Sequence, residues 1–183
     1  SCLPKGGAPF PLVGRDVPIG NVVVAEMESL VPDQPENTLP PGAKHVPIAR
    51  LILRANPDAG TEHPERSASL KALRVDKVGS STRDFDVERV LLYWDREADD
   101  SPEVGWPNWA PDDDDLLVGQ GAVSGGRAIF KDLDIPIPQT STGAHLIIAF
   151  DISSHATTDV TVGALVHNDT YVKLGGPDLM LPR

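Results

Sequence analysis

The chain has few aromatic residues, few basic residues and one cysteine. Aromatic side chains make up 5% of its 183 residues, and 27 acidic residues outnumber 16 lysines and arginines, giving a formal net charge of −11. Nucleic-acid binding depends on lysine and arginine neutralising phosphates, so this balance argues against nucleic acid and anionic membranes as partners. The single cysteine, Cys2, has no partner within the chain. It is an incidental thiol, a site of intermolecular pairing or a site of lipidation.

Long apolar runs are also missing. The longest uninterrupted one is LIIAF at 146–150, far short of the roughly 18 residues that cross a bilayer. We therefore predict no membrane span. The sequence starts without a methionine and without a basic, apolar signal segment, as a processed or trimmed chain would. We expect an exported protein, secreted or held at a cell surface.

Recognisable catalytic and zinc motifs are absent. The five histidines lack the spacing of a zinc site, and the chain contains neither a phosphate-binding loop nor a G-x-S-x-G elbow. Ser153, Ser154 and His155 are adjacent, but adjacency is not the geometry of a catalytic triad. We predict that the chain is not an enzyme. A secreted hydrolase with paired acids stays as a less favoured alternative, because the chain is so acidic.

The residues that are present indicate an all-β fold. The sequence is 40% hydrophobic, with 16 glycines and 18 prolines, which suits short strands joined by many turns. We predict an antiparallel β-sandwich of the Greek-key or immunoglobulin-like type, with a jelly roll as the alternative. Alternating apolar residues mark strands from residue 44 onward and at 69–78, 87–94, 116–120, 127–131, 133–137, 144–152, 159–167 and 171–174.

Some strands carry more detailed expectations. The apolar positions slip phase between Leu70 and Leu73, which predicts a β-bulge. Within 144–152, His145 and Asp151 should face outward. The segments 144–152 and 159–167 give the clearest strand patterns.

The N-terminal region differs from the rest of the chain. Nine of the 18 prolines fall within the first 47 residues, so we expect a Pro-rich arm over 1–43 and a sandwich domain over 44–183. Within the arm, IGNVVVAEM at 19–27 reads as an isolated strand centred on Val22, Val23 and Val24. It either donates itself to a neighbouring subunit's sheet or folds back as an edge strand of its own domain. Head-to-tail donation would build a filament.

The strongest anomaly is the acidic stretch 95–115, DREADDSPEVGWPNWAPDDDD. It holds nine acids and one base, so it contributes 1 − 9 = −8 to the net charge. Like charges about 4 Å apart repel by roughly 4 kcal/mol at an effective dielectric near 20, so such a loop stays splayed in water or gathers around a cation. Carboxylate oxygens favour a hard cation such as calcium.

The spacing of the first acids resembles a calcium loop only in part. Asp95, Glu97 and Asp99 occupy positions 1, 3 and 5, but an EF-hand needs glycine where Asp100 stands and an acid where Trp106 stands. The remaining oxygens must come from 112–115. The candidate ligands are Asp95, Glu97, Asp99, Asp100, Asp113 and Asp115, and the alternative is a solvated acidic turn that binds nothing tightly.

Three short motifs carry a family resemblance. LYWD at 92–95, DDDLL at 113–117 and FDIS at 150–153 resemble calcium-stapled β-sandwich modules of secreted bacterial surface proteins, over about 44–168. The insert SPEVGWPNWAP is longer than such turns usually are. The resemblance implies Asp95, Asp99, Asp113 and Asp115 as ligands. We therefore expect a non-enzymatic, calcium-stabilised subunit of a filament, pilus-like fibre or surface layer that contacts further subunits.

Trp106 and Trp109 suggest a second function. Two tryptophans in one loop can form an aromatic platform for a sugar ring, as in a carbohydrate-binding or adhesion module. The alternative is that both fold back as a lid on the sandwich or lie in a subunit contact.

Overall fold

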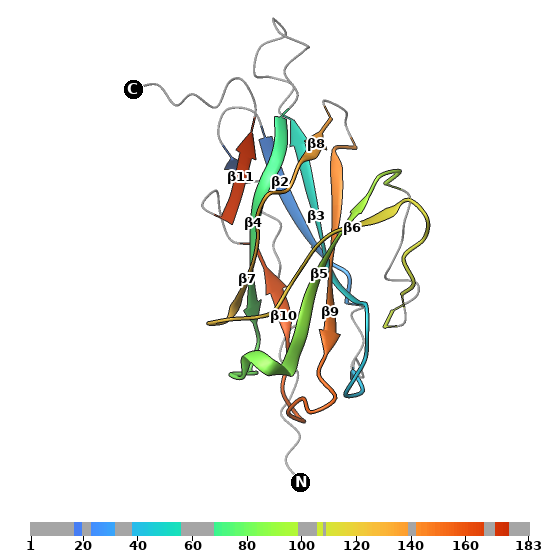
Figure 1. Ribbon diagram of the computed structural model, residues 1–183, viewed down its shortest axis with the longest axis vertical. Coiled ribbons are helices and arrows are strands. Elements are labelled where there is room, and N and C mark those ends of the chain that lie inside the picture. Colours follow the sequence, from blue (N-terminus) through green and yellow to red (C-terminus); the bar gives the residue numbers. More distant parts are fainter. Residues whose placement is uncertain are drawn as a thin grey trace, which may run out of the picture.

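The computed structural model describes residues 17–19, 23–31, 38–55, 68–98, 106–107, 109–138, 142–166 and 171–175. Two antiparallel sheets pack face to face, which confirms the predicted all-β sandwich (Figure 1). The strands are β1 Val17–Ile19, β2 Val23–Ser29, β3 Val46–Ala55, β4 Ala68–Val78, β5 Val87–Asp95, β6 Asp115–Gly121, β7 Arg127–Phe130, β8 Ile135–Ile137, β9 Ala144–Ile152, β10 Gly163–Leu165 and β11 Val172–Gly175, with a 3-10 turn, η1, at Asp84–Asp86.

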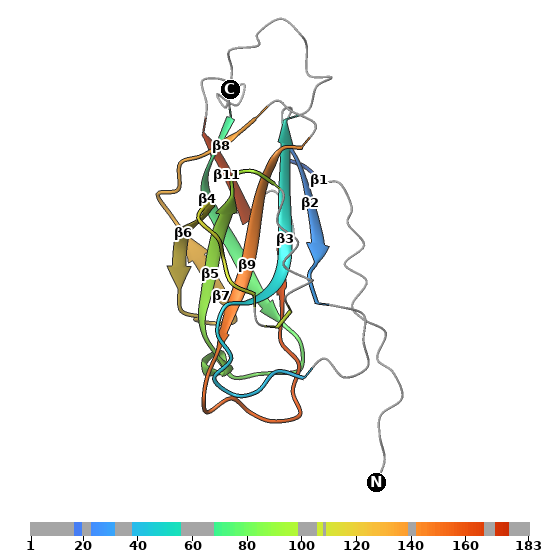
Figure 2. The same ribbon diagram turned by 90° about the vertical axis from the view of Figure 1, so that its right-hand side faces the viewer.

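The first sheet has six strands in the order β1-β2-β3-β9-β5-β6. Strands β9 and β5 run side by side through its middle, while β2 and β6 lie towards its two sides (Figures 1 and 2). Strand β5 is an interior strand of this sheet, since it pairs with β9 on one side and with β6 on the other. Among the described residues, no helix is long and apolar enough to cross a membrane.

The second sheet is built around β4. Strands β10 and β11 pair with different parts of β4, and so do β7 and β8. The register between β11 and β4 shifts so that Lys173 faces Ala72 and Leu174 faces Leu70, which leaves Lys71 unmatched. This irregularity confirms the bulge that the phase slip predicts. The Lys71 carbonyl instead accepts a hydrogen bond from the Leu133 amide, at 3.0 Å.

The main core lies between the sheets. Alternate residues of each strand point into it, and its largest fully buried side chains include Phe150, Leu51, Leu53, Leu70, Leu73, Leu92, Ile135, Ile137, Leu146 and Ile148. Deleting such side chains typically costs 2–5 kcal/mol, so this interface holds the two sheets together.

The predicted strand at 159–167 is much shorter in the structure. Strand β10 covers only Gly163–Leu165, and Asp159 has a left-handed backbone with φ 59°. Ahead of β10, Thr161 bonds a turn rather than a strand, since its amide donates to Ser80 Oγ at 2.9 Å and its carbonyl accepts from the Ser81 amide at 3.1 Å. These local hydrogen bonds compete with those of the sheet, which explains why alternating apolar residues predicted a longer strand than β10.

The N-terminal strand segment folds onto its own sheet. Strand β2 pairs along seven residues with β3 of the same chain, from Val23 opposite Ala55 to Ser29 opposite Ala49. Strand β2 also pairs with β1, a partner that the sequence analysis did not predict. Strand β1 contains Pro18, and proline is tolerated there because β1 is the edge strand of the sheet. Val22 and residues 1–16 lie outside the described part of the chain.

Candidate metal centre

Two of the predicted acids meet where β5 ends and β6 begins. Asp95 and Asp115 are directly opposite each other in the β5–β6 register. Both side chains are buried, Asp95 being 1% and Asp115 9% exposed. Directly opposite residues on antiparallel strands have Cβ atoms about 4.5–5.5 Å apart. The fold therefore holds two carboxylates next to each other, away from bulk water.

Each of these carboxylates also shapes its own turn. Asp95 Oδ1 accepts a hydrogen bond from the Ala98 amide at 2.6 Å, and Asp115 Oδ2 accepts one from the Asp112 amide at 3.1 Å. Ala98 adopts a left-handed backbone with φ 58°. A hydrogen-bonded turn thus lies at each end of the loop, and in each turn the carboxylate of the strand residue accepts from a loop amide.

Arg96, the one base of the acidic stretch, follows Asp95 along the strand end. Its side chain is exposed and donates to the carbonyls of Asp114 at 3.1 Å and Asp113 at 3.3 Å. Arg96 therefore ties the two ends of the loop together through main-chain oxygens.

Of the other four predicted ligands, the structure describes Glu97 and Asp113, and these two do not join the pair. Glu97 and Asp113 are exposed, and Asp99 and Asp100 lie outside the described residues. In the part of the chain that the structure describes, no three His, Cys, Asp or Glu side chains form a metal-binding group. Of the four predicted ligands that the structure describes, it therefore brings together two, Asp95 and Asp115.

His145 is a neighbour that sequence reasoning missed as part of this site. On the side of β5 away from β6, it lies directly opposite Asp95 in the β5–β9 register. Asp115, Asp95 and His145 thus form one row across three strands, and His145 Nε2 contacts the Thr142 carbonyl at 2.9 Å. Only the strand register reveals this row, because the three residues are far apart in sequence.

Near its second end, the described part of the acidic loop places Trp109 over the outer face of the six-stranded sheet. Trp109, 7% exposed, belongs to a small buried cluster on that face, where its ring and that of Tyr93 form a T-shaped pair at a centroid distance of 5.1 Å. The cluster comprises Leu30, Leu91, Tyr93, Trp109, Ile147 and Ala149. Trp106 is half-buried, and its indole N–H donates to the Pro47 carbonyl at 3.1 Å. Trp109 therefore covers the outer face, whereas Trp106 packs partly against the main core, so these two described side chains do not form one exposed aromatic platform.

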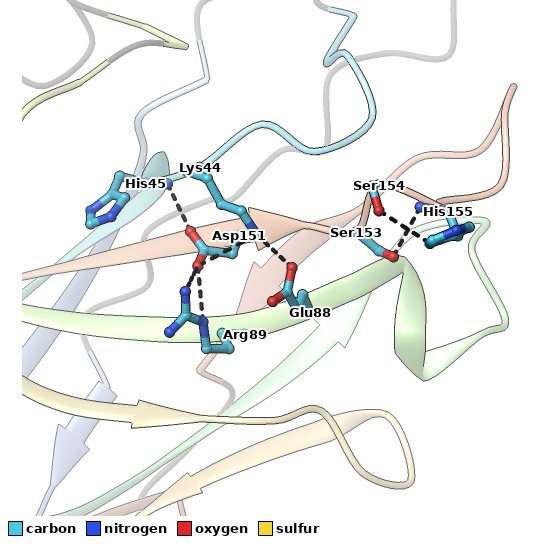
Figure 3. A network of polar contacts seen from close by, with 8 residues as sticks. All are labelled: Lys44, His45, Glu88, Arg89, Asp151, Ser153, Ser154 and His155. Carbon is cyan, nitrogen blue, oxygen red and sulfur yellow. Dashed lines mark hydrogen bonds and ion pairs between the residues drawn. The ribbon is translucent and has the colours of Figure 1, made fainter.

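A polar network continues the same face beyond the cluster (Figure 3). Asp151 lies on the outer side of the sheet, as the alternation predicts, yet its side chain is 0% exposed because other residues cover it. Its carboxylate accepts hydrogen bonds from the His45 amide at 2.9 Å and from Arg89 at 2.6 and 3.0 Å. Charge pairing allows this acid to be buried.

Tyr93 links the network to Trp109. Its hydroxyl lies 2.7 Å from His45 Nδ1, and its ring packs against Trp109. Burial raises the pKa of Tyr93 above its ordinary value of 10.0, and the charges of Asp151 and Asp115 raise it further. The negative charges of Asp151 and Asp115 therefore both oppose ionisation of the Tyr93 hydroxyl.

The serine and histidine neighbours are placed on an exposed turn after β9. Ser154 Oγ lies 3.1 Å from His155 Nδ1, and Ser153 Oγ accepts from the His155 amide at 3.1 Å. The acid closest to them in sequence, Asp151, is engaged by Arg89 and the His45 amide instead (Figure 3). Ser153, Ser154 and His155 therefore form a hydrogen-bonded turn.

Comparison with protein-family models finds no match to this chain, and comparison with curated proteins finds no match either. The fold and the site define it as an all-β sandwich with paired buried carboxylates at one end of a sheet.

Proposed function

We propose that the chain is a non-enzymatic, calcium-stabilised β-sandwich subunit of an extracellular or cell-surface structure, such as a filament, a pilus-like fibre or a surface layer. The observation that carries the proposal is the buried pair Asp95 and Asp115 at the base of the acidic loop. Two ionised carboxylates about 5 Å apart repel by roughly 3 kcal/mol at an effective dielectric near 20. A bound divalent cation would turn this repulsion into attraction.

Calcium suits the site better than other cations. It takes six to eight oxygen ligands in flexible geometry, and extracellular modules bind it at about 10⁻⁴–10⁻³ M. Asp95 and Asp115 would supply the inner oxygens. Glu97, Asp99, Asp100 and Asp113, together with loop carbonyls, are the proposed source of the others.

The assembly role rests on β2. In one chain, β2 pairs with β3, and two ion pairs flank the ladder, Glu26 with Arg54 and Glu28 with Arg50. The same complementarity would serve between copies, so that β2 of one subunit fills the place beside β3 of the next. Such head-to-tail contacts do not close and would produce fibres.

Thermal unfolding with calcium and with chelator tests the metal. We expect a few millimolar calcium, roughly 3 to 30 times a Kd of about 10⁻³–10⁻⁴ M, to stabilise the fold by about 1–2 kcal/mol and so to raise the melting temperature by a few degrees. Asp95→Asn and Asp115→Asn should each remove most of this shift. Asp159→Asn is the matched control, because Asp159 is exposed, lies on another loop and has a left-handed backbone that asparagine accepts.

Equal melting temperatures in calcium and in chelator would refute the metal. A calcium shift that persists in both loop variants would place the ion elsewhere. Electron microscopy of the purified protein at high concentration tests the assembly role, for which fibres or sheets are expected and dispersed monomers would contradict it.

A further inference from the structure

We infer that the N-terminal segment and the acidic loop form one coupled cover over the outer face of the six-stranded sheet, so that seating of either strengthens seating of the other. The inference deepens the proposed function, and its calcium-dependent part rests on it. If the loop binds calcium, the same coupling makes the ion a regulator of whether β2 stays on its own sheet.

The first observation is a shared attachment point on β3. The register between β3 and β9 shifts between Pro47 and Ala49, which marks a bulge at Ile48. At this bulge the Pro47 carbonyl accepts from the Trp106 indole at 3.1 Å, and the Ile48 carbonyl accepts from the Leu30 amide at 3.0 Å. Two consecutive carbonyls thus hold the acidic loop and the residue that follows β2.

The second observation is the shared apolar cluster. Leu30, 3% exposed, and Trp109, 7% exposed, belong to the same buried group over β5 and β9. These two residues come from the segment after β2 and from the acidic loop, whereas the other four members lie on the sheet strands. Removing Leu30 or Trp109 exposes apolar surface of the cluster that both residues share. Their contributions to stability are therefore not independent.

The geometry also gives the direction of the effect. Trp109 lies three residues before Asp112, whose amide donates to the Asp115 carboxylate at 3.1 Å, so a constraint on this turn would also restrain Trp109. A cation between Asp95 and Asp115 would hold Trp109 down on the cluster. Leu30 and β2 would then be harder to release, and a calcium-free chain would exchange its N-terminal strand more readily.

Hydrogen exchange measured by mass spectrometry tests the coupling without any metal. In the full chain, Trp109→Ala and the milder Trp106→Phe, which keeps a ring but loses the N–H donor, should each speed exchange in peptides covering β2. We expect about a tenfold faster exchange for Trp109→Ala. Leu133→Ala is the matched control, since Leu133 is equally buried but packs in the main core. Unchanged β2 exchange in both tryptophan variants, or an equal change in Leu133→Ala, would overturn the inference.

A calcium titration by calorimetry tests the reciprocal direction. Leu30→Ala should weaken calcium binding about 5- to 10-fold, because coupling between two sites acts equally in both directions. Unchanged affinity in a folded Leu30→Ala protein would overturn the calcium-dependent part. If the unaltered chain binds no calcium, the proposed metal fails, while the exchange experiment still decides whether loop and strand are coupled.

Discussion

At the scale of single residues, Asp86 shows how the sandwich tolerates a buried charge. It is 1% exposed at the end of η1, and its carboxylate accepts from Ser81 Oγ at 2.6 Å and from the Thr157 amide at 2.8 Å and hydroxyl at 3.0 Å. Burial alone would raise the pKa of Asp86, but these hydrogen bonds and the charge of Lys77 outweigh it and lower the pKa below its ordinary value of 3.8. Asp86 thereby joins the turn before β5 to the loop after β9.

This lowered pKa predicts a specific loss of stability in acid. Because the native state holds the proton less tightly than the unfolded state, the Asp86 contribution is complete above about pH 4 and declines as pH falls towards the native pKa. Asp86→Asn should therefore cost about 1–3 kcal/mol at pH 7, and the gap to the unaltered chain should narrow below pH 4. Urea unfolding at a series of pH values measures this gap. A gap that stays constant from pH 7 to pH 3 would show that the charge of Asp86 contributes nothing.

At the scale of elements, the turn into β9 depends on one glycine. Gly143 has φ 75°, and a Cβ there would lie 2.5 Å from the Leu53 carbonyl at the end of β3. Gly143→Ala should therefore cost more than the 1–2 kcal/mol of a left-handed alanine alone, about 3 kcal/mol or more. Gly125→Ala is the matched control, since Gly125 has φ 58° and a Cβ there would have nothing within 4 Å of it. Equal losses in denaturant unfolding would mean that the close approach to β3 is unimportant.

The strands and their register also show which features could be predicted from the sequence and which could not. Strict alternation located β3, β8 and β9, and the phase slip located the bulge at Lys71, because both are local consequences of a two-residue period. The meeting of Asp95 and Asp115 was predictable only as a proposal, since it depends on the register of two strands joined by a long loop. The row with His145 and the outer cluster depend on register and on loop path together, which no local pattern fixes.

At the scale of the whole molecule, the proposed assembly requires β2 to leave β3 of its own chain and to pair with β3 of a neighbour. Glu28 and Arg50 are directly opposite in the β2–β3 register and their side chains approach to 3.7 Å. Opposed residues on antiparallel strands lie within the Cα separation that a disulfide needs. A chain with Glu28→Cys and Arg50→Cys, in a Cys2→Ser background, therefore records under oxidation which copy supplies β2.

We expect oxidation of this double-cysteine variant to give different products in the monomer and in assembled material. Oxidised monomers should contain an internal disulfide, whereas assembled material should give a ladder of linked chains on a non-reducing gel. Arg74→Cys with Ile129→Cys is the matched control, because that opposed pair lies within the second sheet and should close internally in both states. An internal disulfide in assembled fibres would mean that subunits associate through another surface. Calcium added before oxidation should reduce the ladder, because Trp109 held on the cluster keeps Leu30 and β2 on their own chain. The acidic loop and the N-terminal strand would then set, between them, when assembly begins.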